Sequence, residues 1–143
     1  EKVIQARAIV RRAVFLVQKE VAKRITALPG TRDYGLLTVS LGLFFDAALL
    51  FEVKASAFHP PPKVDSAVVR LEPAARAAEL GVADPARFLR FAARCFHHKR
   101  KTLRNNLADE IPRERLDAIP ETSLRAEQLD IRQLAALYRR LVV

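Results

Sequence analysis

The 143-residue sequence contains no methionine and no tryptophan, and it has a single cysteine, Cys95. One cysteine excludes an internal disulfide framework and is typical of a reducing compartment, so we expect a cytoplasmic protein in which Cys95 is a small buried thiol. No apolar run approaches the length needed to span a bilayer, and no signal peptide opens the chain, so we expect no membrane association. The chain begins at Glu1 rather than at methionine, from which we expect it to be part of a longer protein.

Acidic residues are scarce relative to basic ones. The sequence has 16 Asp and Glu residues against 25 Lys and Arg residues, which gives a formal net charge of +9 and a pI near 10.4. Half of the residues are hydrophobic, enough for a globular core. The excess of positive charge favours a polyanionic partner, with nucleic acid as the first candidate and an anionic membrane as the second.

The first half of the sequence mixes strand-like and helix-like patterns. Residues 14–17 form a short apolar run typical of a strand covered on both faces, and the helix that follows places Val21, Ile25 and Leu28 on one face before Pro29 and Gly30 end it. Residues 34–45 are long enough for a second helix and residues 48–53 for a strand, although periodicity alone does not separate these assignments.

Alternation then predicts a strand over residues 64–71. Ala67, Val69 and Leu71 share one side of this strand. The first part of the chain is therefore α/β in character, but it has too few strands for a whole sheet.

Helical patterns occupy the second half of the sequence. Asp84 is placed to cap a helix that has Pro85 at its first position, and Asp130 with Gln133 forms a capping-box pattern before the last helix. The inner face of that last helix is predicted to consist of Ile131, Leu134, Leu137, Tyr138 and Leu141.

A stretch without any acidic residue runs from Arg87 to Arg104. Taken as one helix, it has an apolar side that includes Phe88 and Phe91 and an opposite basic side. A solvated surface is the ordinary alternative, but a long stripe without acidic partners repels itself, so contact with an external polyanion is favoured. The basic side consists of Arg87, Arg90, Arg94, His97, Lys101 and Arg104.

Three consecutive prolines precede the strand at residues 64–71. They fix their own φ angles and donate no backbone hydrogen bonds, so residues 58–63 are expected to form a stiff arm with Phe58 at its start. Phe58 is either a platform on which a base stacks or a residue that packs inward, and physics alone slightly favours packing. His59 is expected to be a loop residue, because no partner for a catalytic base is identifiable.

Two further groups of polar residues are candidates for a ligand site. Gln18, Lys19 and Glu20 follow the first strand, where open α/β sheets bind ligands, although Glu20 also suits a helix N-terminus. Cys95, His97 and His98 are close in sequence, but neighbouring helical positions point in different directions and no second ligand cluster exists. No metal site is predicted.

Four ordered motifs resemble one known family. They are FLVQKEVAKR at 15–24, YG at 34–35, FHPPPKVDSAVVR at 58–70 and KRKTLRNNL at 99–107, and RAEQL at 125–129 fits the same pattern. Together they resemble the small-subunit ribosomal RNA adenine dimethyltransferases, from about residue 14 to the end of the chain.

The resemblance implies a Rossmann-like methyltransferase domain followed by a small helical domain. It implies an enzyme of ribosome biogenesis that uses S-adenosylmethionine to methylate the N6 amines of two adjacent adenosines near the 3′ end of small-subunit rRNA. Phe58 would then stack on the target adenine, with Gln18, Glu20, Pro60, Pro61, Asp65 and Ser66 supporting the pocket. The implied RNA contacts are Lys63, Arg87, Arg90, Arg94, Lys99, Arg100, Lys101 and Arg104.

Three features of the family pattern are missing from the sequence. The family's glycine-rich turn, its acidic ribose ligand and its Asn-Leu-Pro-Tyr motif are not in the chain, so no cofactor-binding residue is expected here, and the fragment alone is expected to be inactive. Residues 1–73 would be the C-terminal part of the methyltransferase domain, 74–84 a linker and 85–143 a helical RNA-binding domain.

The expected partners are small-subunit rRNA and the 30S particle, and the chain is expected to be a monomer. The alternatives are a noncatalytic RNA-binding or ribosome-assembly module and a helix-turn-helix DNA binder. The DNA binder explains neither the proline arm nor the α/β part.

Overall fold

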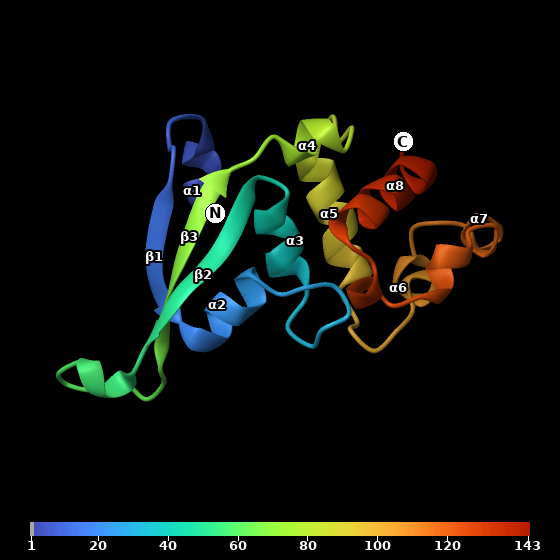
Figure 1. Cartoon of the computed structure of the whole chain (residues 1–143). Coiled ribbons are helices and arrows are strands. Elements are labelled where there is room, and N and C mark those ends of the chain that lie inside the picture. Colours follow the sequence, from blue (N-terminus) through green and yellow to red (C-terminus); the bar gives the residue numbers. More distant parts are fainter. Residues whose placement is uncertain (1) are drawn as a thin grey trace.

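The computed structural model describes residues 2–143, and its first part is built around a three-stranded sheet (Figure 1). The strands lie in the order β1-β3-β2, and β3 is antiparallel to both neighbours. Helices α2 and α3 contact the sheet from one side. The elements of this part are α1 (Lys2–Gln5), η1 (Ala6–Ala8), β1 (Ala13–Gln18), α2 (Lys19–Ile25), α3 (Leu36–Gly42), β2 (Phe45–Val53), η2 (Ala55–Ala57) and β3 (Ser66–Pro73).

The central strand β3 confirms the alternation seen in the sequence. Ala67, Val69 and Leu71 are buried, whereas the residues between them are only partly covered. The same register pairs Phe15 with Val69 and Leu16 with Val68. Phe15 therefore shares the helix-covered face with Val69, and Leu16 lies on the opposite face.

Three predictions for the first part are wrong in detail. The strand at residues 14–17 is not covered on both faces: Leu16 is 51% exposed, because β1 is at the edge of the sheet and the helices cover one face only. Leu28 is 71% exposed, since α2 ends at Ile25, before reaching it. The apolar stretch 34–45 divides into the short helix α3 and the start of β2.

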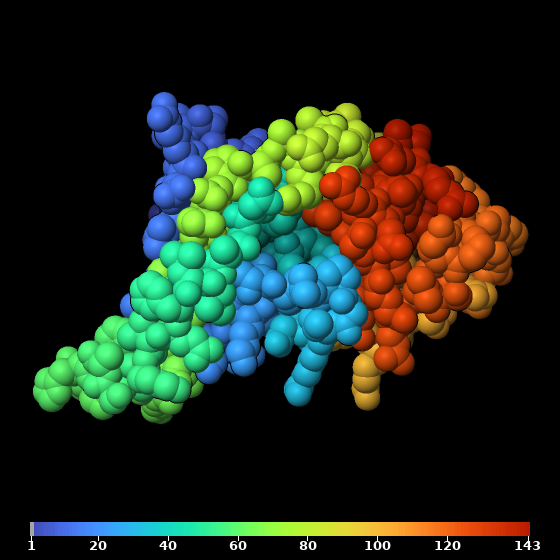
Figure 2. Space-filling view, viewed as in Figure 1, coloured from blue at the N-terminus to red at the C-terminus, as the bar shows by residue number. Residues whose placement is uncertain are grey.

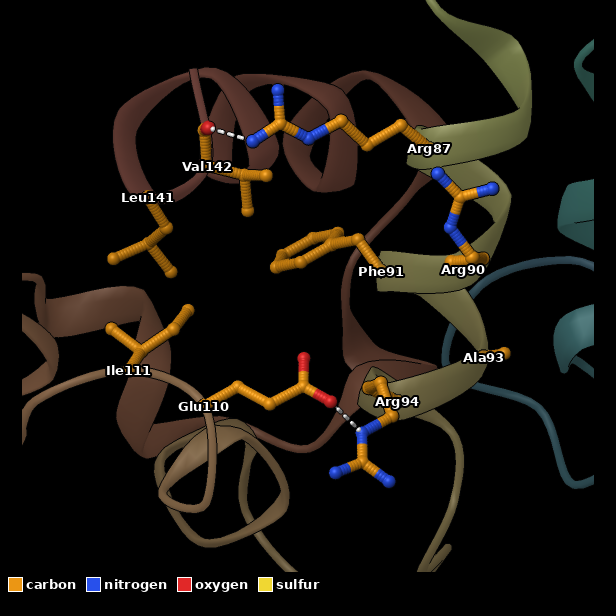
Figure 3. A pocket seen from close by; sticks show the side chains of 9 residues that line it. All are labelled: Arg87, Arg90, Phe91, Ala93, Arg94, Glu110, Ile111, Leu141 and Val142. Carbon is orange, nitrogen blue, oxygen red and sulfur yellow. Dashed lines mark hydrogen bonds and ion pairs between the residues drawn. The ribbon is translucent and has the colours of Figure 1, made fainter.

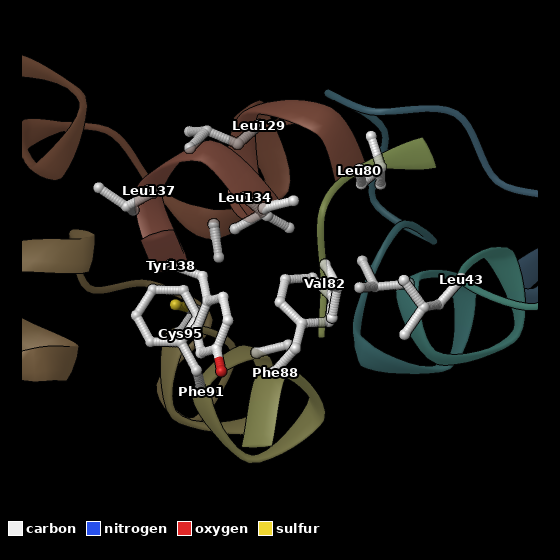
Figure 4. Close-up of a cluster of buried hydrophobic side chains, with 14 of the residues drawn as sticks. Leu43, Leu80, Val82, Phe88, Phe91, Cys95, Leu129, Leu134, Leu137 and Tyr138 are labelled. Carbon is white, nitrogen blue, oxygen red and sulfur yellow. The ribbon is translucent and has the colours of Figure 1, made fainter. Parts of the chain in front are cut away.

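The second part is helical, as predicted, and its core forms where α5 crosses α8 (Figure 4). The ring of Tyr138 on α8 lies 5.5 Å from that of Phe88 and 5.6 Å from that of Phe91 on α5. Cys95 is fully buried in the same cluster. The elements are α4 (Arg76–Glu79), α5 (Pro85–Cys95), α6 (Leu103–Leu107), α7 (Arg113–Asp117), η3 (Pro120–Ser123), η4 (Ala126–Gln128) and α8 (Ile131–Leu141).

Both predicted helix starts in this part are confirmed. The Asp84 carboxylate accepts a hydrogen bond from the Arg87 backbone N–H, with Pro85 at the first position of α5. At the start of α8, Asp130 and Gln133 each accept a hydrogen bond from the other's backbone N–H. Each cap satisfies backbone donors that the first helical turn leaves free.

Residues 74–84 run across the molecule between the sheet and α8, in yellow-green in Figure 2. Arg76 donates hydrogen bonds to the backbone carbonyls of Gly42 and Phe45 and pairs with Asp46. On the other side, the Arg139 guanidinium donates to the Leu80 carbonyl over 2.7 Å, and Leu80 itself is buried. The predicted division into two domains stays a prediction, and the connecting segment is anchored at both ends.

Candidate nucleic-acid interface

The connection between β2 and β3 projects from the body of the molecule, at the lower left of Figures 1 and 2. It contains η2, which is followed by the partly buried Phe58. His59 is in the loop, as predicted. The Asp65 carboxylate closes the base of this loop, since it accepts hydrogen bonds from the Ala55 N–H over 3.0 Å and from Lys54 Nζ over 3.2 Å. The Ala55 hydrogen bond, followed by the one from Lys54, lowers the pKa of Asp65 below its usual value.

A cleft of about 660 Å³ opens where β1 passes into α2. Four of the predicted site residues meet in the wall of this cleft. Gln18 and Glu20 come from one segment of the chain, and Lys63 and Asp65 come from another that is distant in sequence. The Lys19 backbone N–H donates to the Asp65 carbonyl over 3.0 Å and thereby joins the start of α2 to the projecting loop. The full lining consists of Gln18, Lys19, Glu20, Lys23, Arg32, Asp33, Lys63, Val64 and Asp65.

Sequence reasoning missed two basic residues of this cleft, Lys23 and Arg32, whereas Lys19 belongs to the polar group predicted at the end of the first strand. The i, i+4 spacing of Lys19 and Lys23 on α2 is a signal for one shared helix face, whereas nothing in the sequence places Arg32 beside them. The pKa of Lys19 is raised above its usual value. The main cause is a hydrogen bond to Glu52, whose carboxylate lies 2.6 Å from Lys19 Nζ. Of the other predicted residues, Phe58, Pro60, Pro61 and Ser66 lie outside the lining of this cleft.

The basic segment 87–104 is not one helix. Helix α5 ends at Cys95, residues 96–102 form turns and bends, and α6 begins at Leu103. The side chain of Asn106 holds this break in place: its amide nitrogen donates to the carbonyls of Cys95 and His98, and its oxygen accepts from the His98 N–H. The prediction of one continuous basic helix face is therefore wrong.

Acidic residues from later in the chain pair with three members of the basic set. Arg94 lies 2.6 Å from Glu110, Arg104 lies 2.9 Å from Asp117, and Lys99 lies 3.8 Å from Glu127. The expectation of an unneutralised stripe is wrong for these residues, because the segment lacks acids in sequence but meets them in space. Within residues 2–143, Arg90, Arg100 and Lys101 are exposed and their side chains form no ion pair or hydrogen bond.

The turn at residues 96–102 lies beside the cleft. Lys99 donates a hydrogen bond to the Arg32 carbonyl. A neighbouring cavity of about 340 Å³ is lined by Lys99 and also by Arg32, Asp33 and Glu20, all three of which line the cleft. Basic groups thus extend from Lys63 through Arg32 to the turn, which gives a surface suited to a nucleic-acid backbone.

A cradle for S-adenosylmethionine is not found among the described residues. The connections after β1 and β3 both lead into helices, and neither contains a glycine, since the chain's glycines are at positions 30, 35, 42 and 81. The residues present therefore do not fit this cofactor. Over residues 2–143, no three His, Cys, Asp or Glu side chains are grouped so as to hold a metal ion, and no helix has the length and apolar character needed to cross a membrane.

Comparison with known proteins agrees with the motifs and the fold. A family model described as "Ribosomal RNA adenine dimethylase" matches residues 1–141. The chain belongs to this family. A relative from Myxococcus xanthus, "Ribosomal RNA small subunit methyltransferase A", is 50% identical over 109 residues, which are 76% of this chain and 38% of the relative. The protein of the same name from Chlorobaculum parvum is 41% identical over 145 residues, 98% of this chain and 50% of the relative.

Two solved structures resemble the fold of this chain. A dimethyladenosine transferase from Plasmodium falciparum aligns with a TM-score of 0.77 and 25% identity, over 97% of this chain and 61% of that one. The 23S rRNA methyltransferase ErmE aligns with a TM-score of 0.61 and 26% identity, over 92% and 55% of the two chains. The α/β arrangement is therefore that of a methyltransferase fold, and the chain spans about half the length of the curated relatives that it matches.

Proposed function

We propose that the intact protein is an rRNA adenine N6-dimethyltransferase, and that this chain supplies its RNA-facing portion. The enzyme would use S-adenosylmethionine to methylate two adjacent adenosines near the 3′ end of small-subunit rRNA, acting on the 30S particle during ribosome biogenesis. The family match over residues 1–141 carries the proposal. The projecting loop supports it, because the loop carries Phe58 and its residues Lys63 and Asp65 line the cleft.

The chemistry explains why such an enzyme needs this loop. The lone pair of the adenine amine is delocalised into the ring, so the amine is a poor nucleophile that must be extruded from the RNA and oriented towards the methyl donor. Phe58 would cover one face of the extruded base, a stacking contact of about 1–3 kcal/mol. Asp65 would hold the loop in position, because its carboxylate joins the two ends of the loop.

Electrostatics would guide the RNA backbone to the same place. Lys23, Arg32 and Lys63 line the cleft, and a hydrogen bond from Lys99 to the Arg32 carbonyl joins it to the turn that carries Arg100 and Lys101. Phosphate contacts position a nucleic acid without reading its sequence. The methyl donor would be bound by a part of the enzyme outside these residues, so the chain alone would bind RNA without turnover.

Replacement of Phe58 by alanine tests the proposal in the intact enzyme. Loss of the stacking contact is expected to slow methylation of under-methylated small subunits by about tenfold or more, since about 1.4 kcal/mol corresponds to a factor of ten. The thermal unfolding midpoint should change little, because Phe58 is outside the buried core. The measurement is transfer of labelled methyl groups to the two adenosines.

His59→Ala is the matched control, since it changes the adjacent exposed loop residue and leaves the phenyl ring in place. Unchanged methylation by Phe58→Ala would contradict the assigned role of Phe58.

A noncatalytic RNA-binding or ribosome-assembly module is the second candidate. The exposed side chains of Arg100 and Lys101, which have no partner in residues 2–143, suit RNA binding in such a module as well. The intact protein separates the two functions: an assembly module would bind small subunits and leave both adenosines unmethylated.

A further inference from the structure

A separate cleft of about 660 Å³ lies in the helical part, between α5, residues 110–111 and the end of α8 (Figure 3). It shares no residue with the cleft at the end of β1. The Phe91 ring points into this cleft from α5, and Ile111 and Leu141 face it from the other side (Figure 3). These three side chains form an apolar floor, and each is at most 8% exposed.

Charged groups occupy opposite ends of this cleft. Arg87 and Arg90 lie at one end, where Arg87 donates a hydrogen bond to the Val142 carbonyl over 2.9 Å. Among the described residues the Arg90 side chain forms no hydrogen bond or ion pair, so its donors are free for a ligand. At the other end, Arg94 Nε lies 2.6 Å from Glu110 Oε1, and the second carboxylate oxygen points into the cleft (Figure 3).

We propose that this cleft binds one unpaired nucleotide of an RNA. The base lies against Phe91, Ile111 and Leu141, and the phosphate is held by Arg90 with Arg87 beside it. This inference deepens the proposed function, because it rests on RNA being the partner of the chain. The helical part then binds one extruded nucleotide in addition to the target adenine.

The distribution of charge fixes the orientation of the nucleotide. Arginine donates paired hydrogen bonds to phosphate oxygens, which favours the phosphate at the Arg90 end. The free oxygen of Glu110 repels a phosphate but accepts a hydrogen bond from an amino or imino N–H on the edge of a base. The apolar floor between the two ends covers the planar part of the base and removes it from water.

Weak binding of a free nucleotide is expected, because the floor is narrow and a mononucleotide brings no neighbouring contacts. We expect a dissociation constant of about 1 mM or more. Methyl NMR suits this range. Ile111, Leu141 and Val142 line the cleft and provide methyl groups that report on it directly.

The test titrates the full 143-residue chain with adenosine 5′-monophosphate and, separately, with ribose 5-phosphate. We expect the Ile111, Leu141 and Val142 methyl resonances to shift with the nucleotide and to shift far less with the sugar phosphate, which lacks the base. A short single-stranded RNA should shift the same methyl groups at lower concentration. Equal shifts with both small ligands would reduce the cleft to a phosphate site and overturn the proposal.

Two matched substitutions locate the phosphate. Arg90→Gln should weaken nucleotide binding about tenfold, the effect of losing a charge-assisted contact worth about 1.4 kcal/mol. Arg11→Gln, which removes one charge from another exposed arginine without a side-chain partner in residues 2–143, should leave the titration unchanged. Equal weakening by both would show a general charge effect and overturn the site.

Absence of shifts at saturating nucleotide, or stronger shifts with an acidic peptide than with RNA, would also overturn it. Failure of the methyltransferase proposal is read separately, from methylation of small subunits by the intact protein. That assay measures methyl transfer by the intact protein, whereas the titration measures ligand binding by the 143-residue chain.

Discussion

Asn106 shows how much one buried polar side chain decides in this protein. It is 6% exposed and makes three hydrogen bonds to the backbone of Cys95 and His98. These bonds satisfy backbone groups where α5 ends and stabilise the turn that carries Lys99, Arg100 and Lys101. The direction of the basic residues therefore depends on an uncharged residue.

Replacing Asn106 by alanine should destabilise the chain by about 2–4 kcal/mol, because buried backbone groups lose their partners. Urea unfolding monitored by circular dichroism measures this. Asn105→Ala is the control, since Asn105 is exposed and its side chain makes no hydrogen bond in the described structure, and it should cost less than about 0.5 kcal/mol. Equal effects of the two substitutions would show that the Asn106 hydrogen bonds contribute nothing.

For individual residues, the sequence predicted which side chains are buried better than it predicted which charged side chains form ion pairs. Cys95 is the buried thiol that was expected, and burial raises its pKa well above the usual range. The pairing of Arg94 with Glu110 was not predictable, because the partner lies beyond the stretch in which acids are absent. Phe58 was left between two roles by local reasoning, and its place in a projecting loop leaves it outside the buried core.

At the scale of elements, the two faces of the sheet differ in what they contact. Helices α2 and α3 cover the face that holds Val69 and Leu71. The opposite face presents Val14, Leu16 and Phe51, each more than half exposed. Exposed apolar patches of this kind are typical of surfaces that contact other protein.

Alanine substitutions on the two faces should separate them. Leu71→Ala should cost about 2–5 kcal/mol, because Leu71 is 2% exposed and its removal leaves a cavity. Leu16→Ala should cost less than about 1 kcal/mol in the isolated chain, since little of that side chain is buried on folding. Denaturant midpoints of the two variants measure the difference, and similar losses would mean that the outer face is covered in solution.

Elements were predictable wherever the signal was local. The caps of α5 and α8 and the alternation along β3 depend on residues a few positions apart, and all three are confirmed. The break between α5 and α6 was not predictable, because the helical period continues through residues 96–102 and only the contacts of Asn106 interrupt it. Burial of β1 was overestimated, since an apolar run does not reveal whether a second layer is present.

At the scale of the whole molecule, the net charge is +9, but only some of the basic side chains are available to an external partner. Arg94, Lys99 and Arg104 have acidic partners, whereas Arg100 and Lys101 are exposed without one in the described part of the chain. Binding to a polyanion should therefore depend more on the turn at residues 96–102 than on the length of α5. Salt dependence measures this directly.

Removing both charges with Arg100→Gln and Lys101→Gln should weaken binding to a 3′-terminal small-subunit rRNA segment and reduce the salt slope. The reduction should be about 1.4 to 1.8, because each phosphate contact contributes roughly 0.7 to 0.9 to the slope. The control, Arg113→Gln with Arg115→Gln, removes two charges from α7, at the far end of the helical part (Figure 1). An unaltered slope in the first variant would exclude the turn as an RNA contact.

Sequence patterns were sufficient to predict the helix caps, the alternating central strand, the sign of the net charge and the resemblance to the dimethyltransferases. These signals are carried by residues near one another in the chain or by composition, so no folded structure is needed to read them. The folded structure was needed to show which basic residues lack acidic partners, which face of β1 is uncovered, and that Lys23, Arg32 and Lys63 meet in one cleft. Those outcomes depend on contacts between segments tens of residues apart, which local pattern does not encode.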